Sequence, residues 1–394
     1  MGVVPARGRS RTVPFEVPLP RAPRNSARRA PARSRFVGAV VLLAAACVGV
    51  FPTSAARAEY DVFDICTHPA WQLSPTTNGR VVVWADLRNY DGPGYAPPGT
   101  PCGDIYGHDL VTGETWALSL DPAHESGSGI DGDTVVWERD GDIIGYDLQS
   151  RGEFVIAGGA HQEELPDISG DIVVWHDDRD NYPTLTDIYA KNLATDTTFP
   201  VYVGSGTQRY ARINDNTVAW EDHRSDTADI YANDLSTGQT FAVCTDASEQ
   251  LRPDVGGDWI VWTDSDNANV NAPGADQDIR GYNMVTGELL DIAVGEGLAR
   301  WARTDGKTVV WRDDRHGHTD IFGFDLETRE EFEISVHPDW ATWCYVHEDL
   351  VVWRDVNSAN GRYDIVGAYV PEPMTLTVLV GGAWLLVARR RRRI

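Results

Sequence analysis

A short pattern of apolar and polar positions recurs seven times along this 394-residue chain. Each copy has a β-branched or aliphatic run that ends at a tryptophan, then an acidic loop, then Asp-Ile. The tryptophans of the seven copies are Trp84, Trp137, Trp175, Trp220, Trp262, Trp311 and Trp353. They are 53, 38, 45, 42, 49 and 42 residues apart. A period near forty, built from strand-forming residues, predicts a radial array of small sheets.

The run before each tryptophan is continuously apolar, as in Val81–Trp84 and Val309–Trp311. A strand with one face in water alternates apolar and polar residues, whereas a strand covered on both faces does not need to. The middle strands of a propeller blade are covered in this way. The third copy fits four strands, placed before Gly170, up to Trp175, at 187–193 and at 199–203.

The turns agree with this reading. The residue five before the tryptophan is glycine in five copies and Asp215 or Glu348 in the others, which predicts a tight turn with positive φ. The outer hairpin carries Thr-Gly at 112–113, 237–238 and 286–287. The sixth copy has Thr328-Arg329 instead, so a different turn is expected there.

The seventh copy stops near Tyr369 without an outer strand. Residues 63–67 match the outer strand of the fourth copy, Phe241–Thr245, and we expect them to complete the last blade and close the ring. Closure removes the exposed sheet edges that promote aggregation. The prediction is an all-β, seven-bladed β-propeller of four-stranded antiparallel blades, one domain at 59–370, closed by its N-terminal strand.

The Asp-Ile-Tyr strand and the arginine-containing loop after each tryptophan resemble the TolB-like group of β-propellers. The resemblance covers all seven copies. It implies the propeller fold and leaves the activity open, because propellers host many functions.

The N-terminus predicts an export signal. Residues 1–35 carry nine arginines and one acid, and an apolar stretch at 36–51 leads to the small-residue site Ala56-Arg57-Ala58. This is typical of a basic leader with a secretory signal peptide, here residues 1–58, which signal peptidase would remove.

The C-terminus resembles a PEP-CTERM sorting signal in all three parts. Pro371, Glu372 and Pro373 precede an apolar stretch at 374–388, and the cluster Arg389, Arg390, Arg391, Arg392 and Arg393 follows. The resemblance implies that an exosortase-type protease cuts near the motif. Fifteen apolar residues are marginal for crossing about 30 Å of hydrocarbon. The expectation for 371–394 is transient membrane insertion, followed by release to the cell surface or exterior; the alternative is a permanent tail anchor.

Charge excludes one class of partner. Without residues 1–58 and 371–394, 19 basic and 57 acidic residues remain, a net charge of −38. Such a body repels nucleic acid.

Four cysteines remain in this body. An exported protein can form disulfides, and strand direction places Cys66 and Cys102 on one face of adjacent blades. We predict a Cys66–Cys102 disulfide that pins the ring closure. Cys244 and Cys344 are interpreted as small buried residues.

The acidic loops after the tryptophans recur with arginines in most copies, which favours a structural Asp–Arg network over one catalytic site. No cofactor is expected, with calcium as the alternative. Its candidate ligands are carboxylates of the fifth copy: Asp264, Asp266, Asp276 and Asp278.

A ligand site is expected where the loops differ. The long loops at 85–103 and 263–277 contrast with the short one at 138–141. Candidate ligand-binding side chains near one mouth of the channel are Tyr90, Tyr95, Tyr182, His176, His223, His316 and His318. No catalytic residue is assigned, because no nucleophile has a partner visible in the sequence.

The resulting hypothesis is an exported propeller at the cell surface or in the extracellular matrix. It would bind or scaffold a polysaccharide or another surface protein without catalysis. The alternative is a polysaccharide-active lyase or hydrolase with its site at the channel mouth.

Overall fold

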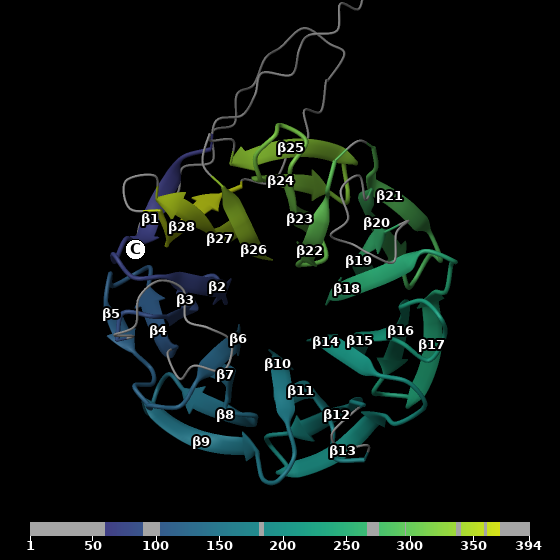
Figure 1. The fold of residues 1–394 in the computed structure, drawn as a ribbon, viewed down its shortest axis with the longest axis horizontal. Helices are drawn as coiled ribbons and strands as arrows, with labels where there is room; N and C mark the ends of the chain where they lie inside the picture. Colours follow the sequence, from purple (N-terminus) through teal and green to yellow (C-terminus); the bar gives the residue numbers. More distant parts are fainter. Residues whose placement is uncertain are drawn as a thin grey trace, which may run out of the picture. The chain divides into compact units, whose positions relative to one another are not determined.

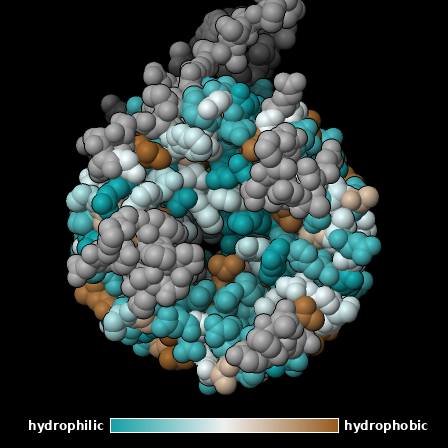
Figure 2. Space-filling model, in the orientation of Figure 1, coloured by the Kyte–Doolittle hydropathy of each residue, from teal (hydrophilic) through white to brown (hydrophobic). Residues whose placement is uncertain are grey.

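The computed structural model describes residues 60–89, 103–180, 185–265, 276–295, 297–335, 340–357 and 361–370. They form 28 strands in seven four-stranded antiparallel sheets that stand in a ring (Figure 1). The space-filling view shows a hollow at the middle of this ring, which we call the central channel (Figure 2). The predicted all-β, seven-bladed propeller is confirmed.

The strands of blades one to three follow the chain outward from the channel. Blade one has β2 (Gln72–Thr77), β3 (Val81–Asp86), β4 (Asp104–Asp109) and β5 (Thr115–Ala117). Blade two has β6 (Glu125–Asp131), β7 (Thr134–Arg139), β8 (Asp142–Asp147) and β9 (Gly152–Ala157). Blade three has β10 (Glu163–Ser169), β11 (Ile172–Asp177), β12 (Asp187–Asn192) and β13 (Thr197–Tyr202).

Blades four to six repeat this order. Blade four has β14 (Gln208–Asn214), β15 (Thr217–Asp222), β16 (Asp229–Asp234) and β17 (Gln239–Cys244). Blade five has β18 (Glu249–Gly256), β19 (Trp259–Ser265), β20 (Gln277–Asn283) and β21 (Leu289–Ala293). Blade six has β22 (Arg300–Thr304), β23 (Thr308–Asp313), β24 (Asp320–Asp325) and β25 (Glu330–Ser335).

Blade seven joins the two ends of the ring. It has β26 (Ala341–His347), β27 (Leu350–Asn357) and β28 (Arg362–Tyr369), and its outer strand is β1 (Val62–Cys66). β1 pairs antiparallel with β28, with Phe63 opposite Gly367. The predicted closure by the N-terminal strand is confirmed.

The core lies between the blades. Seven clusters of buried apolar side chains each join two neighbouring blades. The seven repeated tryptophans are all fully buried. Trp137 packs toward blade one, whereas its neighbour Val136 packs toward blade three. The second strand of each blade is therefore covered on both faces, as the apolar run predicted.

The turns between inner and second strands have the predicted conformation. Positive φ occurs at Gly79, Gly132, Gly170, Asp215, Gly257, Gly306 and Glu348. The expectation of a different outer turn in the sixth copy was wrong. Arg329 adopts φ of 62°, close to the 72° of Gly287, so a side chain accepts the left-handed conformation there.

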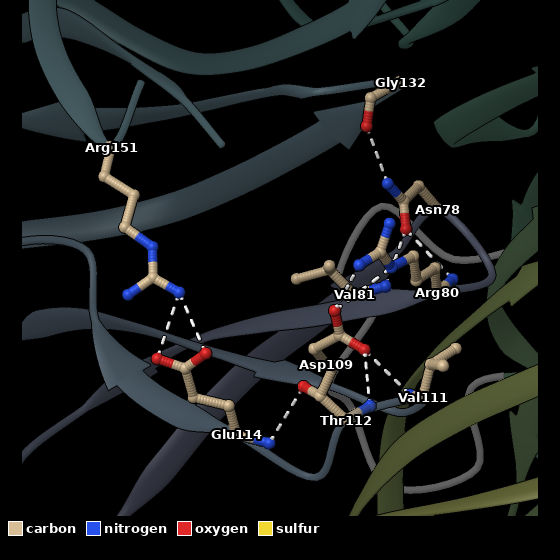
Figure 3. Close-up of polar contacts among 9 residues, drawn as sticks. All are labelled: Asn78, Arg80, Val81, Asp109, Val111, Thr112, Glu114, Gly132 and Arg151. Atoms are coloured by element: carbon tan, nitrogen blue, oxygen red, sulfur yellow. Dashed lines mark hydrogen bonds and ion pairs between the residues drawn. The ribbon is translucent and has the colours of Figure 1, made fainter. Parts of the chain in front are cut away.

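Hydrogen bonds join successive blades near these turns. The Asn78 amide donates to the Gly132 carbonyl at 2.7 Å, and Asp131 accepts from the Gly170 N–H at 2.6 Å. On the outer hairpins, the Arg151 guanidinium of blade two lies 2.9 Å from the Glu114 carboxylate of blade one (Figure 3).

A buried brace stabilises the loop after the tryptophan in blade three. The Trp175 indole donates to Asp177 at 3.0 Å, and the backbone N–H and the guanidinium of Arg179 donate to the same carboxylate. The guanidinium then lies 4.1 Å from the Tyr189 ring centre. The predicted Asp–Arg network is confirmed here.

Three other blades contain the same brace. Its Trp, Asp and Arg are residues 84, 86 and 88 in blade one, 220, 222 and 224 in blade four, and 311, 313 and 315 in blade six. Blade two differs, because Trp137 and Arg139 both donate to Glu125 of the inner strand.

The prediction that Cys244 and Cys344 are buried is confirmed for Cys344 and only in part for Cys244. Cys66 and Cys344 are buried and Cys244 is half-buried, and no two of these three are bonded to each other. Cys102 lies outside the described residues, so the Cys66–Cys102 disulfide stays a prediction.

Ring closure can be tested at β1. Ile65 is buried between blades seven and one, so Ile65→Ala should lower the free energy of unfolding by about 2–4 kcal/mol in urea titrations. Val62→Ala is the control on the same strand, because Val62 is exposed and should cost less than about 0.5 kcal/mol. Equal losses of unfolding free energy for both variants would show that Ile65 does not hold the ring closed.

The brace can be tested at Arg179. Arg179→Gln leaves the fully buried Asp177 carboxylate without its ion pair, and we expect a loss of about 2–3 kcal/mol in unfolding free energy. Arg151→Gln breaks an exposed pair that solvent screens, so it should lower the unfolding free energy much less. If both variants melt alike, the brace contributes no more than a surface contact.

Candidate functional site

Positions that change from blade to blade point to the site. The brace recurs and is structural, so a single ligand site must use residues that do not recur. The residue after each repeated tryptophan is one such position: Ala85, Glu138, His176, Glu221, Thr263, Arg312 and Arg354. It faces the next blade, because its side chain alternates with that of the tryptophan.

A second variable position lies on the inner strands. Each inner strand has a β-bulge whose first residue is left-handed, with φ between 51° and 62°. The residues there are Ser74, Gly127, Leu165, Tyr210, Arg252, Trp301 and Trp343. Such backbone costs about 1 kcal/mol or more for a residue with a side chain. The left-handed backbone recurs in every blade, but the residue type at this position differs from blade to blade.

Five of these bulge residues line one cavity. Leu165, Tyr210, Arg252, Trp301 and Trp343 border a space of about 70 Å³. The inner strands that carry them are the strands nearest the middle of the ring (Figure 1). Hydrophilic side chains predominate around the middle of the ring in the space-filling view (Figure 2). The cavity therefore belongs to the channel wall of blades three to seven.

Arginines and tryptophans gather on the side of blades five to seven. The Arg312 guanidinium lies 3.5 Å from the Trp301 ring centre, and Trp301 and Trp343 have ring centres 4.5 Å apart. Arg252 lies 4.9 Å from Trp301, and Arg354 lies 5.3 Å from Trp343. We call Arg252, Arg300, Arg312 and Arg354 the arginine cluster.

Like charges lie close together in this cluster, and the Arg312 guanidinium donates to the Thr342 hydroxyl at 3.0 Å. Arg300 and Arg312 stand opposite each other on β22 and β23. Burial and the nearby charges of Arg300, Arg354 and Arg252 lower the pKa of Arg312 to about 9. Within the described part of the chain, no carboxylate forms an ion pair with Arg252, Arg300 or Arg312, and the Nε atoms of Arg300 and Arg312 have no hydrogen-bond partner.

Carboxylates occupy the side of blades two to four. Burial and the nearby Glu164 raise the pKa of Glu138 to about 7. Glu164 also contacts His176 at 3.0 Å. The Glu221 carboxylate accepts from the Arg252 backbone N–H at 3.0 Å and contacts His223 at 2.7 Å. The variable positions after the tryptophan thus carry carboxylates in blades two and four and arginines in blades six and seven.

A second layer of charges lies two residues further along the inner strands. The Asp254 carboxylate lies 3.8 Å from the Arg212 guanidinium and 3.6 Å from the Arg303 guanidinium. Burial raises the pKa of Asp254 to about 6, although both arginines oppose this. Asp167 accepts from the Ile213 N–H at 2.9 Å. These residues join blades three to six, and Arg212 and Arg303 also line the cavity.

The predicted ligand-binding residues are only partly described. Tyr90, Tyr95 and Tyr182 lie outside the described residues. His176 and His223 contact carboxylates of the channel wall, as given above. His316 and His318 both contact Asp320, at 2.9 and 3.2 Å.

The candidate calcium ligands do not form a metal cluster among the residues that the structure describes. Asp264 lies 3.5 Å from Arg280, and Asp278 accepts from the Gly295 N–H at 3.3 Å. No group of three or more His, Cys, Asp or Glu is arranged for a metal in the described ranges. Asp266 lies outside them, so calcium binding here stays a prediction.

Sequence reasoning missed the arginine cluster. Arg312 and Arg354 interrupt a position that is otherwise small, polar or acidic, directly after the repeated tryptophan. That irregularity is visible in the sequence. The bulges that bring Trp301, Trp343 and Arg252 beside Arg312 and Arg354 are visible only in the structure.

The chain ends lie outside the described residues, so the leader and the sorting signal stay predictions. Among the described residues, no helix is long and apolar enough to span a membrane.

The raised pKa of Glu138 can be tested through the pH dependence of stability. The pKa of Glu138 is raised from 4.5 to about 7, so the folded state holds this proton while the unfolded chain releases it. Wild-type stability should fall relative to Glu138→Gln as pH rises from 4.5 to 7, by about 3 kcal/mol at most. Glu330→Gln, on the exposed start of β25, is the control in urea titrations at each pH. A constant difference between wild type and Glu138→Gln across this range would contradict the raised pKa.

Comparisons with known proteins support the fold. No family model and no curated protein matches the chain. An oligogalacturonate lyase in complex with manganese aligns at 15% identity and TM-score 0.56, over 79% of this chain and 94% of that one. The β-propeller domain of the Trilobed protease from Pyrococcus furiosus, described as having an open velcro topology, aligns at 13% identity and TM-score 0.60, over 76% and 95%.

TolB from Acinetobacter baumannii aligns more loosely, at 13% identity and TM-score 0.45, over 76% of this chain and 65% of that one. That match is too weak to add to the argument. At these identities the likeness to solved structures shows the propeller fold alone.

Proposed function

We propose that this protein is an exported, non-enzymatic binding propeller that recognises a polysaccharide or another surface protein through its channel pocket. One observation carries the proposal. The two variable positions of an otherwise regular repeat place Arg252, Trp301 and Trp343 on the wall of one cavity, and Arg312 and Arg354 lie over the rings of these two tryptophans. Aromatic and arginine side chains that converge on a cavity are typical of ligand sites.

Export is part of the proposal. Residues 1–58 would be removed by signal peptidase, and residues 371–394 would insert in the membrane until an exosortase-type protease releases the body. The acidic body supports this, because a net charge of −38 keeps a protein soluble outside a cell. Nucleic acid is not a proposed partner.

A polysaccharide-active enzyme is the second candidate. The overlap with an oligogalacturonate lyase fold keeps it open, and so does Glu138, because a carboxyl with a pKa near 7 can donate and accept protons at neutral pH. No metal or cofactor is assigned to this reaction.

One experiment separates the two candidates. The purified protein is incubated with a panel of matrix polysaccharides, and both retention on the polymer and new reducing or unsaturated chain ends are measured. We expect retention without new ends, and Glu138→Gln should then bind like wild type. Cleavage that is lost in Glu138→Gln would establish the enzyme instead. If the protein shows neither retention nor cleavage, both candidate functions are excluded.

A further inference from the structure

Three arginines line the cavity on the channel wall: Arg212, Arg252 and Arg303. Each comes from a different inner strand, namely β14, β18 and β22. The remainder of the wall is largely apolar and consists of Leu165, Tyr210, Pro253, Trp301, Trp343 and Cys344. Ligand pockets typically combine such an apolar wall with a few charged or polar groups that fix the orientation of the ligand.

Arg212 and Arg303 share one aspartate without a close hydrogen bond to it. Arg212 Nε lies 3.8 Å from Asp254 Oδ1, and Arg303 Nη1 lies 3.6 Å from the same oxygen. A guanidinium that donates to a carboxylate approaches it to about 2.7–2.9 Å. Among the described residues, neither guanidinium has a closer polar contact, and the two side chains are only 18% and 17% exposed. Because a guanidinium has five N–H donors, both groups keep donors for a further acceptor.

The two nearby aspartates hold backbone groups of the following blade. Asp254 Oδ2 accepts from the Thr304 N–H at 2.8 Å, and Asp167 accepts from the Ile213 N–H at 2.9 Å. Burial raises the pKa of both carboxyl groups, which favours their neutral forms. Three guanidinium groups therefore face at most two negative charges, and the cavity wall keeps at least one positive charge.

Aromatic rings hold the third arginine in place. The Arg252 guanidinium lies 4.8 Å from the Tyr210 ring centre and 4.9 Å from the Trp301 ring centre. The backbone N–H of Arg252 donates to Glu221 at 3.0 Å, which fixes the start of the side chain. A guanidinium that lies over aromatic rings still presents the N–H donors at its edge. Arg252 is thus oriented before any ligand binds.

A carboxylate attached to an apolar body fits this wall. The carboxylate supplies one negative charge and two acceptor oxygens, which match the forked donors of arginine. Guanidinium groups held close together away from water are costly unless an anion joins them. The apolar body of the ligand would contact the rings of Tyr210, Trp301 and Trp343, and it would leave water as it does so.

We propose that Arg212, Arg252 and Arg303 bind the carboxylate of a small apolar organic acid, whose body packs against Trp301 and Trp343. The acid joins inner strands of blades four to seven through one ligand. This inference goes beyond the proposed function, because a small acid can occupy the cavity whatever larger partner the protein binds.

The test uses the purified protein and four probes: benzoate, benzamide, acetate and phenyl phosphate. Benzamide has the shape of benzoate without its charge, and acetate has the charge without the ring. Affinities are measured by isothermal titration calorimetry at constant ionic strength, because salt screens the charges. We expect benzoate to bind at least about tenfold more tightly than benzamide and than acetate. Phenyl phosphate should bind no more tightly than benzoate, because its second negative charge would meet Asp254 and Asp167.

Matched variants locate the site. Arg252→Gln and Arg303→Gln should each weaken benzoate binding at least about tenfold. Arg209→Gln is the control and should stay within about twofold, because Arg209 lies 5.4 Å from the Tyr210 ring centre and pairs with Glu221 but does not line the cavity. Benzoate should also raise the melting temperature of wild type and of Arg209→Gln more than that of Arg252→Gln. If Arg303→Gln fails to fold, Arg252→Gln decides.

Each part of the inference has an outcome that would overturn it. Equal binding of benzoate and benzamide, or unchanged binding in both cavity variants, overturns the carboxylate site. Equal binding of benzoate and acetate overturns the apolar body, and tighter binding of phenyl phosphate overturns the single negative charge. If no probe binds, the whole inference is wrong. The proposed function is tested separately by retention on polysaccharides, so the two failures are distinguishable.

Discussion

The structure depends on one constraint: the second strand of every blade is apolar on both faces. Val136 and Trp137 are adjacent in the chain, yet one packs toward blade three and the other toward blade one. A single blade would leave both faces in water, at a cost of about 25 cal/mol for each Å² of apolar surface. Each blade is therefore stable only between two others, and the ring must close. β1 closes it by supplying the outer strand of blade seven.

In this closed ring of similar blades, the residues that recur in most blades stabilise the fold, and the residues that differ from blade to blade are available for binding. The brace of tryptophan, aspartate and arginine holds the loop after the second strand in blades one, three, four and six with the same three residue types. The bulge on each inner strand keeps its left-handed residue whatever the side chain is. The backbone is thus fixed by the repeat, and the side chains at the bulge and after the tryptophan are free to differ.

Those differences separate opposite charges around the ring. Glu138 and Glu221 lie on one side, and Arg312 and Arg354 on the other. The tryptophan rings beside the arginines offset part of the cost of grouping like charges, because a guanidinium over an aromatic face is stabilised by about 0.5–2 kcal/mol.

The sequence by itself determined the number of blades, their four-stranded order, the closure by the N-terminal strand and the Asp–Arg brace. All of these arise from local spacing that repeats, so each copy supports the interpretation of the others. The tertiary structure decided where the non-repeating residues meet. Trp301, Trp343, Arg252, Arg312 and Arg354 lie on five strands of three blades, and only the bulges and the curvature of the ring bring them together. Contacts between side chains far apart in sequence carry no periodic signal, which is why the arginine cluster was found in space and not along the chain.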